Sequence, residues 1–322
     1  MDPLKFRPIL KRNVWGGRRL GDLLGKPVGP HSDYAESWEI CDHGPDQSVV
    51  IDGPWRDWSL QRLVREHAGE LLGRHAGILQ FPLLIKFLDA RDRLSVQVHP
   101  DDARASRYAP GERGKSETWV VLAAGPQSCV YAGLLPGIDE ALLRAALAEG
   151  TIERCLHRVP VVAGDCLYIP AGTVHAIGAG TLLAEVQQSS DLTFRLFDWN
   201  RTGGDGKPRR LHISEALDSI DFRRGPVDRI RPTMNHDAGP NCELLVTCPF
   251  FTIHRHRLTE PVVVTDDHRS HVIVGLSGST DCRGRHSTQR IAVGDTVLLP
   301  ASSLPAVLER NPESVVLDVF WE

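Results

Sequence analysis

Four side chains that commonly bind metal ions lie far apart in this chain of 322 residues: Gln97, His99, Glu117 and His175. Segment 94–99 alternates between apolar and polar residues, so on a β-strand Ser95, Gln97 and His99 share one face. Glu117 stands in an otherwise apolar segment, where a buried carboxylate is costly unless it is paired or bound to a metal. The pattern predicts that these side chains converge inside a β-fold.

His175 ends one of two similar segments, residues 164–175 and 294–305, which match position by position. Both begin with Gly-Asp, continue with a short apolar strand and close that strand with Pro-Ala. The second segment has Pro305 where the first has His175. We interpret this as a duplicated β-fold in which one copy keeps a metal ligand, although Gly-Asp turns are also common local chemistry.

The four side chains together predict a metal site with one carboxylate and no thiolate. Such a site leaves a divalent ion with about one unit of net positive charge and preserves its strength as a Lewis acid. Two histidines and one carboxylate also describe the iron site of many oxygenases, but the neutral amide of Gln97 favours zinc. Taken singly, each residue has a simpler interpretation, such as a core histidine or an ordinary ion pair between Lys115 and Glu117.

Short segments rich in Val, Ile, Leu and Phe, separated by Gly, Pro and Asp, predict the strands that position these residues. They are 81–87, 94–99, 117–122, 166–169, 182–186, 193–197, 243–247, 251–255, 262–264, 272–276, 297–299 and 315–320. Their spacing is typical of a sandwich or jelly roll.

Three short helices are expected as insertions among the strands. An apolar stripe predicts a helix over residues 60–72 that stops at Gly73, and a weaker pattern predicts another over 214–220. Asp139 and Gly150 are the predicted caps of the third helix. The residues expected to be buried in this third helix are Leu142, Leu143, Ala146 and Leu147.

A stretch rich in Arg, Pro, Asp and Gly, residues 221–240, is the expected linker between two domains. The prediction is a metal-binding catalytic domain over residues 1–225, with the helical insertions, and a second β domain over 240–322. The second domain is expected to be metal-free because Pro305 stands at the repeat position. One metal ion per chain is therefore expected.

Composition excludes several classes of partner. The net charge of −4 offers no basic field for nucleic acid or an acidic membrane surface. No apolar run is long enough to span a membrane, and the N-terminus lacks the pattern of a secretory signal. The seven cysteines show no Cys-x-x-Cys spacing and suit reduced thiols in the cytoplasm. The oligomeric state is left open.

Several motifs resemble those of the type I mannose-6-phosphate isomerases (phosphomannose isomerases) of the short bacterial form. They include Trp-Gly-Gly at 15–17, Glu-Ser-Trp-Glu at 36–39, Gln-Val-His-Pro-Asp-Asp at 97–102, Gly-Lys-Ser-Glu-Thr-Trp at 114–119, Pro-Ala-Gly-Thr-Val-His at 170–175, and residues 185–199. The resemblance covers nearly the whole chain and is weakest in the last third. It implies a mainly β fold of two cupin-like jelly-roll domains.

The resemblance also implies an activity, a cofactor and site residues. The expected reaction interconverts mannose 6-phosphate and fructose 6-phosphate through an enediol, with one Zn²⁺ per chain and a small sugar phosphate as the partner. The zinc ligands of the family match Gln97, His99, Glu117 and His175. Its substrate-pocket positions match Lys86, Lys115, Glu185 and Arg195.

The reaction needs a proton shuttle between two carbons and cations for the phosphate. Glu185 is the simplest general base, Lys115 is a candidate acid, and Arg195 is a candidate for developing charge or phosphate. Lys86 and Ser95 are expected to bind substrate. A structural salt bridge between Arg195 and Glu185 is the alternative. Further phosphate-binding candidates, equally well explained as surface charge, are Lys11 and Arg12.

Two other functions compete with the isomerase. An iron-dependent bicupin dioxygenase would have little use for Gln97 and the pocket lysines. A non-catalytic, sugar-binding cupin would not need an intact ligand set.

Overall fold

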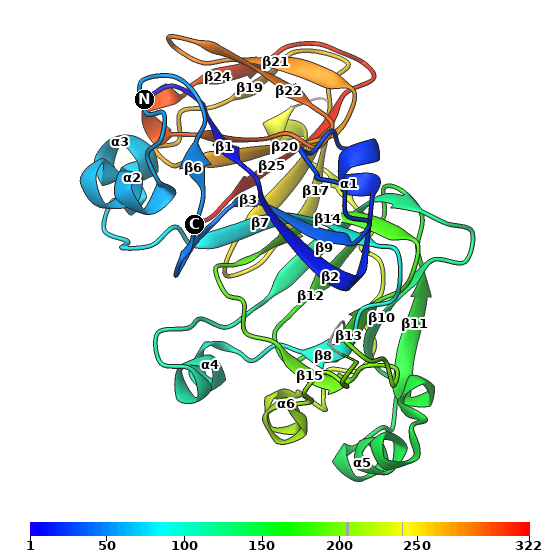
Figure 1. Ribbon diagram of the computed structural model, residues 1–322. Helices are drawn as coiled ribbons and strands as arrows, with labels where there is room; N and C mark the ends of the chain where they lie inside the picture. Colours follow the sequence, from blue (N-terminus) through cyan, green and yellow to red (C-terminus); the bar gives the residue numbers. More distant parts are fainter. Residues whose placement is uncertain (204–205, 240) are drawn as a thin grey trace.

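The computed structural model describes residues 1–203, 206–239 and 241–322. Four β-sheets stack in layers, and short helices lie at the outer faces and edges (Figure 1). All pairings between the strands are antiparallel in the described residues, including the pairs β14–β7 and β18–β25. The predicted mainly β fold with short helical insertions is confirmed.

The two sheets of the first sandwich contain Gln97, Glu117 and His175, and His99 directly follows β8 (Val96–Val98). The six-stranded sheet runs in the order β12 (Cys166–Ile169), β9 (Glu117–Ala124), β14 (Thr181–Gln188), β7 (Leu83–Ala90), β3 (Tyr34–Ile40) and β2 (Ile9–Gly17). The five-stranded sheet runs in the order β11 (Leu156–Pro160), β10 (Cys129–Leu134), β13 (His175–Ile177), β8 (Val96–Val98) and β15 (Phe194–Phe197).

The second sandwich is built mostly from the C-terminal third of the chain. Its eight-stranded sheet has the order β16 (Thr233–Met234), β17 (Cys242–Thr247), β18 (Thr252–Arg257), β25 (Val315–Phe320), β20 (His271–Ser277), β23 (Thr296–Leu299), β1 (Leu4–Arg7) and β6 (Val49–Val50). Its four-stranded sheet has the order β19 (Val262–Val264), β24 (Ala306–Leu308), β21 (Ser279–Arg283) and β22 (Thr288–Ala292). The hairpin of β4 (Asp42–His43) and β5 (Asp46–Gln47) stands apart.

Separate apolar cores hold the layers together. Trp119 and Leu183 belong to the core inside the first sandwich, and Ile273 and Leu299 to the core inside the second. A third core, which includes Phe87, joins the six-stranded sheet to the eight-stranded sheet. Burial of apolar side chains at about 25 cal/mol per Å² makes these three cores the main source of stability.

The α-helices are α1 (Arg19–Asp22), α2 (Leu60–Glu66), α3 (Ala68–Leu72), α4 (Asp102–Tyr108), α5 (Glu140–Glu149) and α6 (Ile213–Ser219). Four 3-10 turns complete them: η1 (Gly73–His75), η2 (Ile152–Cys155), η3 (His236–Ala238) and η4 (Ala301–Ser303). Helices α5 and α6 pack their apolar faces on the outer side of the five-stranded sheet, where Val96, Val98 and Phe194 lie.

Two details of the predicted helices are wrong. The stripe over 60–72 forms two helices, because His67 has φ −132° and ψ 31° and packs its ring against Trp55 and Trp58. In α5, Leu142 is 51% exposed, because Leu143 and Ala146 form the face that packs on the sheet. The caps of α5 agree with expectation, since the Asp139 side chain accepts from Leu142 N and Gly150 has φ +70°.

The two repeated segments share their turn geometry. Gly164 and Gly294 have φ of +93° and +83°, a region that favours glycine. Asp165 Oδ2 accepts a hydrogen bond from the backbone of Val162 at 2.8 Å, and Asp295 Oδ2 accepts from Ala292 at 2.9 Å. The likeness of the segments therefore extends to the bonds that hold each turn.

The predicted division into residues 1–225 and 240–322 stays a prediction. The eight-stranded sheet contains strands from both of these ranges. Strands β1 and β6 come from the N-terminal region but pair within the eight-stranded sheet, where Leu4 lies opposite Leu298. The expected linker forms β16 and η3 near its end. Residue 240, where the second domain was predicted to begin, lies outside the described residues. In the described ranges no helix is long and apolar enough to cross a membrane.

Candidate active site

The predicted ligands lie on the facing sides of the two sheets of the first sandwich. On the five-stranded sheet, Gln97 has His175 and Arg195 as its register partners on the neighbouring strands. On the six-stranded sheet, Glu117 is at the start of β9, and Gln187 is its partner on β14. Residues far apart in sequence therefore meet because the strands that carry them pair or face one another.

Three of the ligand-type side chains converge closely. His99 Nε2 lies 3.3 Å from Glu117 Oε2, and His175 Nε2 lies 3.5 Å from Glu117 Oε1. Nitrogen and oxygen ligands of one tetrahedral zinc ion, each about 2.0–2.1 Å from it, are themselves about 3.3–3.5 Å apart. The separations therefore suit a single ion held between the two imidazoles and the carboxylate.

Backbone carbonyl groups fix the orientation of both imidazoles. His99 Nδ1 donates to Leu192 O at 3.0 Å, and His175 Nδ1 donates to Thr173 O at 2.9 Å. When Nδ1 carries the proton, the lone pair is on Nε2, the atom that faces Glu117 in both cases. Burial and the Lys115 ammonium lower the pKa of His99 to about 3, and burial lowers the pKa of His175. Both rings are therefore neutral, as metal ligands must be.

Gln97 is beside this group and is held by Ser95. Gln97 Nε2 lies 3.3 Å from His175 Nε2, and the Ser95 hydroxyl donates to Gln97 Oε1 at 3.2 Å. Exchanging the amide oxygen and nitrogen by rotation would direct the oxygen toward the site. The Ser95 hydroxyl can accept as well as donate, so it supports Gln97 in either orientation.

Glu117 carries the negative charge of the site. Its Oε1 is buried and has no hydrogen-bond partner within the described part of the chain. Burial alone would raise the pKa of Glu117, but the Lys115 ammonium holds it well below the ordinary value. The Lys115 ammonium lies 2.5 Å from Glu117 Oε2 and 2.9 Å from His99 Nε2. A buried carboxylate with an unsatisfied oxygen between two neutral imidazoles fits a divalent cation.

A cavity of about 320 Å³ adjoins this cluster between the sheets. All the predicted catalytic and substrate-binding residues line it: Lys86, Ser95, Lys115, Glu185 and Arg195. The ligand residues Gln97 and Glu117 line it too, so the cavity opens directly onto the predicted metal site. Its size falls within the range of small-molecule sites, about 300–1,000 Å³.

Glu185 lies in the cavity wall between two lysines. Glu185 Oε1 is 3.5 Å from Lys86 Nζ and 3.9 Å from Lys115 Nζ, and Oε2 accepts from Trp119 Nε1 at 3.1 Å. Burial and the nearby Glu117 raise the pKa of Glu185, although the two lysines act in the opposite direction. Its carboxylate is held by one hydrogen bond and two ammonium groups, and it faces the cavity, which is the position that a general base needs.

Arg195 does not form the salt bridge with Glu185 that the sequence offered as an alternative. Its Nε donates to Ser95 Oγ at 3.3 Å and its Nη1 donates to Arg210 O at 2.9 Å. In the described ranges no carboxylate lies within 4.0 Å of its guanidinium. Burial and the neighbouring Arg209 lower its pKa. The half-buried cation therefore faces the cavity, and no carboxylate of the described residues is in contact with it.

Sequence reasoning missed several residues of the cavity wall. Arg209 binds the Asp198 carboxylate through two hydrogen bonds, of 2.7 and 2.6 Å, and lines the cavity beside Arg195. Further lining residues to which the sequence analysis gave no role are Asn13, Trp15, Glu36, Asp191 and Thr193. The motif Glu-Ser-Trp-Glu already singled out Glu36, whose Oε2 lies 3.4 Å from Lys86 Nζ. Arg209 stands in a segment without periodicity, so no local signal marks it.

Lys11 and Arg12 lie outside the cavity wall. Lys11 Nζ binds Asp46 Oδ1 at 2.6 Å, and Arg12 Nε lies 3.5 Å from Asp33 Oδ1. Both side chains are substantially exposed, at 36% and 43%. Their interpretation as surface charge fits this structure better than a role in phosphate binding.

Comparison with known proteins gives a consistent result. A model of the family "Phosphomannose isomerase type I, catalytic domain" matches residues 4–132. The chain is 35% identical over 299 residues to the mannose-6-phosphate isomerase of Streptococcus mutans, covering 93% of this chain and 92% of that protein. It is 33% identical over 317 residues to the mannose-6-phosphate isomerase ManA of Bacillus subtilis, covering 98% of each.

The fold is also close to a solved structure. The crystal structure of the mannose 6-phosphate isomerase from Bacillus subtilis aligns with a TM-score of 0.91 at 27% identity, over 99% of this chain and 100% of that one. The match extends through both sandwiches, because almost no residue of either chain lies outside it. The chain therefore belongs to the type I phosphomannose isomerase family.

Proposed function

We propose that this enzyme interconverts mannose 6-phosphate and fructose 6-phosphate through an enediol. The observation that carries the proposal is the position of Glu185, a buried carboxylate at the cavity wall, beside the converging ligands His99, Glu117 and His175. Membership of an isomerase family favours this reaction over the iron-dependent dioxygenase and the non-catalytic sugar-binding protein. The curated relatives are named for the same isomerase activity.

The site holds one zinc ion in this proposal, through Gln97, His99, Glu117 and His175. Two neutral imidazoles, one carboxylate and one amide suit zinc and leave a net positive charge on it. When bound, the ion supplies a Lewis acid for the sugar oxygens at C1 and C2.

Glu185 is the proposed general base that moves the proton between C1 and C2. Lys86 and Lys115 flank it and oppose the rise in its pKa that burial causes, which keeps the carboxylate available as a base. The Lys115 ammonium is also positioned to donate a proton to a sugar oxygen, because it lies at the boundary between the ligands and the cavity. Trp119 Nε1 holds Glu185 Oε2 and leaves Oε1 directed toward the lysines.

Arg195 is the proposed partner of the phosphate or of developing negative charge. Its guanidinium has no carboxylate within 4.0 Å among the described residues, while Arg209 is already bound to Asp198. A guanidinium group is planar and carries parallel N–H donors, so it can bind two oxygens of a phosphate at once. Ser95 makes hydrogen bonds to both Arg195 and Gln97. It therefore lies between the proposed phosphate-binding residue and the metal ligands, and it is proposed to contact the substrate there.

A cytoplasmic location accompanies this proposal. All seven cysteines lie within the described ranges and are free thiols, six of them buried. A chain with seven unpaired cysteines suits a reducing compartment, where phosphorylated sugars are metabolised.

The test is an isomerase assay on the zinc-loaded protein with mannose 6-phosphate, run in deuterated water. We expect fructose 6-phosphate to accumulate and solvent deuterium to enter at the carbon that receives the shuttled proton. Glu185→Gln should abolish most of the turnover while zinc content stays unchanged. An absence of turnover in the zinc-loaded wild type would exclude the proposed function, and normal turnover in Glu185→Gln would exclude this base.

A further inference from the structure

A second group of metal-ligand side chains lies inside the C-terminal sandwich. Cys242 on β17 is the register partner of His256 on β18, and His254 lies two residues before His256 on the same face of that strand. One ligand atom from each residue lies within 4.8 Å of those from the other two. Cys242 Sγ is 3.9 Å from His256 Nε2. The sequence analysis did not identify this group.

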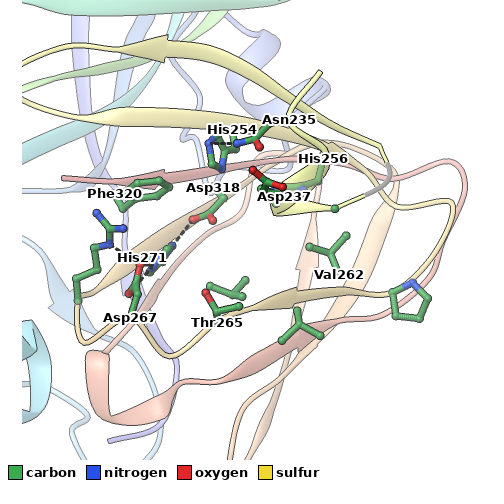
Figure 2. Close-up of a pocket in the computed structure, with 16 residues that line it drawn as sticks. Asn235, Asp237, His254, His256, Val262, Thr265, Asp267, His271, Asp318 and Phe320 are labelled. Carbon is green, nitrogen blue, oxygen red and sulfur yellow. Dashed lines mark hydrogen bonds and ion pairs between the residues drawn. The ribbon is translucent and has the colours of Figure 1, made fainter. Parts of the chain in front are cut away.

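Two members of the group, His254 and His256, line a cavity of about 430 Å³ (Figure 2). This cavity shares no lining residue with the active-site pocket. His254 and His256 line it on the side of the eight-stranded sheet, and Val262 and Val264 of β19 line it on the opposite sheet. The cavity is therefore between the two sheets of the second sandwich, as the active site is between those of the first.

Two features of the histidines point to a ligand. His256 is 2% exposed, and its Nδ1 has no hydrogen-bond partner. A buried imidazole nitrogen without a partner is costly, so native proteins rarely leave one unpaired. His254 is only half buried and faces the cavity, where Asn235 contacts its Nε2 at 3.2 Å (Figure 2). Among the described residues, the His256 imidazole thus has Cys242 Sγ as its one hydrogen-bond partner, and His254 is accessible from the cavity.

We propose that Cys242, His254 and His256 bind a second metal ion, which is zinc in the cell. One sulfur and two imidazole nitrogens form a donor set that zinc prefers, and calcium or magnesium would not be held by it. Binding breaks the S–H bond of Cys242, releases its proton to solvent and forms a metal–sulfur bond, while both imidazoles bind as neutral ligands. The thiolate leaves one net positive charge on the ion.

The charged groups around the cavity balance one another. Asp318 pairs with His271, and Asp267 pairs with His271 and Arg269, so among the described residues these cations are compensated where a metal ion would bind. Asp318 on β25 is the register partner of His254, and its carboxylate accepts from His271 Nδ1 at 2.7 Å. Both Asp318 and His271 line the same cavity (Figure 2). Three protein ligands leave the fourth position of a tetrahedral ion to water or a small anion from the cavity. This proposal departs from the sequence-based expectation of one metal ion per chain.

Cobalt(II) provides a test that separates the two sites. The active site contains no sulfur, so only the Cys242 site can produce a sulfur-to-cobalt charge-transfer absorption in the near ultraviolet. The metal-stripped full chain should bind two cobalt ions, and the absorption should saturate at one ion per chain. Cys242→Ser should lose the absorption, keep one cobalt ion and keep its isomerase activity.

Two further variants complete the test. Cys282→Ser is the matched control, because Cys282 is also a fully buried thiol of the second sandwich and belongs to no ligand group among the described residues. It should retain the absorption. His254→Gln changes a half-buried side chain, so it should fold normally and raise the cobalt concentration at half-saturation at least about tenfold. No charge-transfer absorption in the wild type, or an unchanged one in Cys242→Ser, would overturn the proposal.

Discussion

Glu185 of β14 lies directly opposite Lys86 of β7, and Glu185 Oε1 is 3.5 Å from Lys86 Nζ. Lys86 also lies 3.4 Å from Glu36 Oε2, so one buried ammonium serves two carboxylates, of which Glu185 is buried and Glu36 is partly buried. Burial alone would lower the pKa of Lys86, but Glu36 and Glu185 raise it above the ordinary value. Two carboxylates that line the pocket therefore keep Lys86 protonated.

Lys86→Met should destabilise the enzyme strongly. The substitution leaves Glu36 and Glu185 facing each other across the pocket without their shared cation, and breaking a buried ion pair costs about 3–5 kcal/mol. Chemical denaturation measures the change in the free energy of unfolding. Lys11→Met is a matched control, because Lys11 and Lys86 each place Nζ 4.7 Å from the Trp38 ring centre, but Lys11 is partly exposed. The control should cost about 1 kcal/mol or less, and equal losses in the two variants would contradict this account.

The site was largely predictable where local patterns specify a side chain's direction. Arg195 alternates with Phe194 and Leu196, which pack on the outer side of their sheet, so the guanidinium had to face inward. The same alternation placed Glu185 on the cavity side of β14. Leu94 does not follow the alternation of segment 94–99. It precedes β8 and packs with Trp119 in the core inside the first sandwich.

What the sequence did not reveal depends on long-range pairing. The partner of Arg195 could not be read from alternation, because Ser95 and the Arg210 carbonyl reach it from other segments. Strand β1 joins β23, almost 300 residues away, and no local period reports such a pairing. His254 and His256 form a local His-x-His pair, but the predicted strand 251–255 ended before His256. Cys242 becomes their neighbour only through the register of β17 and β18.

Removing an imidazole ligand should empty the active-site metal position. His175→Ala or His99→Ala leaves Glu117 with one imidazole instead of two, so the bound metal should fall by about one ion per chain and nearly all turnover should be lost. Elemental analysis beside the isomerase assay measures both. His157→Ala is a suitable control, because His157 pairs with the exposed Asp228 outside the pocket. Full metal content in both ligand variants would refute the assignment of the site.

Stability should fall between about pH 6.5 and 9 because of His271. Its Nδ1 donates to Asp318 at 2.7 Å, and its Nε2 lies 3.3 Å from both oxygens of Asp267. Burial alone would lower the pKa of His271, but Asp318 and Asp267 raise it from 6.5 to about 9. When folding raises the pKa of a histidine, protonation of that histidine stabilises the folded protein. The full effect is present below the pKa of the unfolded state and is lost as the pH rises through the pKa of the folded state. The loss is at most about 3.5 kcal/mol.

Denaturation of chelator-treated protein across this pH window checks the prediction without a contribution from metal binding. His271→Gln should remove most of the decline, because the variant has no proton to release there. His268→Gln should leave it unchanged, because His268 is 81% exposed. An equal decline in wild type and His271→Gln would show that another group is responsible.

Arg195→Ala should reduce turnover by about 10²–10³-fold if the guanidinium stabilises developing charge, by analogy with the loss of an oxyanion donor. Metal content should stay unchanged, because a guanidinium is not a ligand. Arg195→Lys should recover only part of the turnover, since a point charge does not reproduce two parallel donors. Isomerase kinetics and elemental analysis on the same preparations measure the three outcomes.

Thermal and chemical denaturation of Arg195→Ala distinguish this role from a structural one. The side chain makes two hydrogen bonds, to Ser95 Oγ and Arg210 O, and two such bonds contribute about 1–3 kcal/mol together. A buried arginine–carboxylate pair would have cost about 3–5 kcal/mol, but Glu185 is bound to Lys86 instead. The loss of stability should therefore be small beside the loss of turnover. A large fall in melting temperature with near-normal turnover at low temperature would defeat the catalytic role.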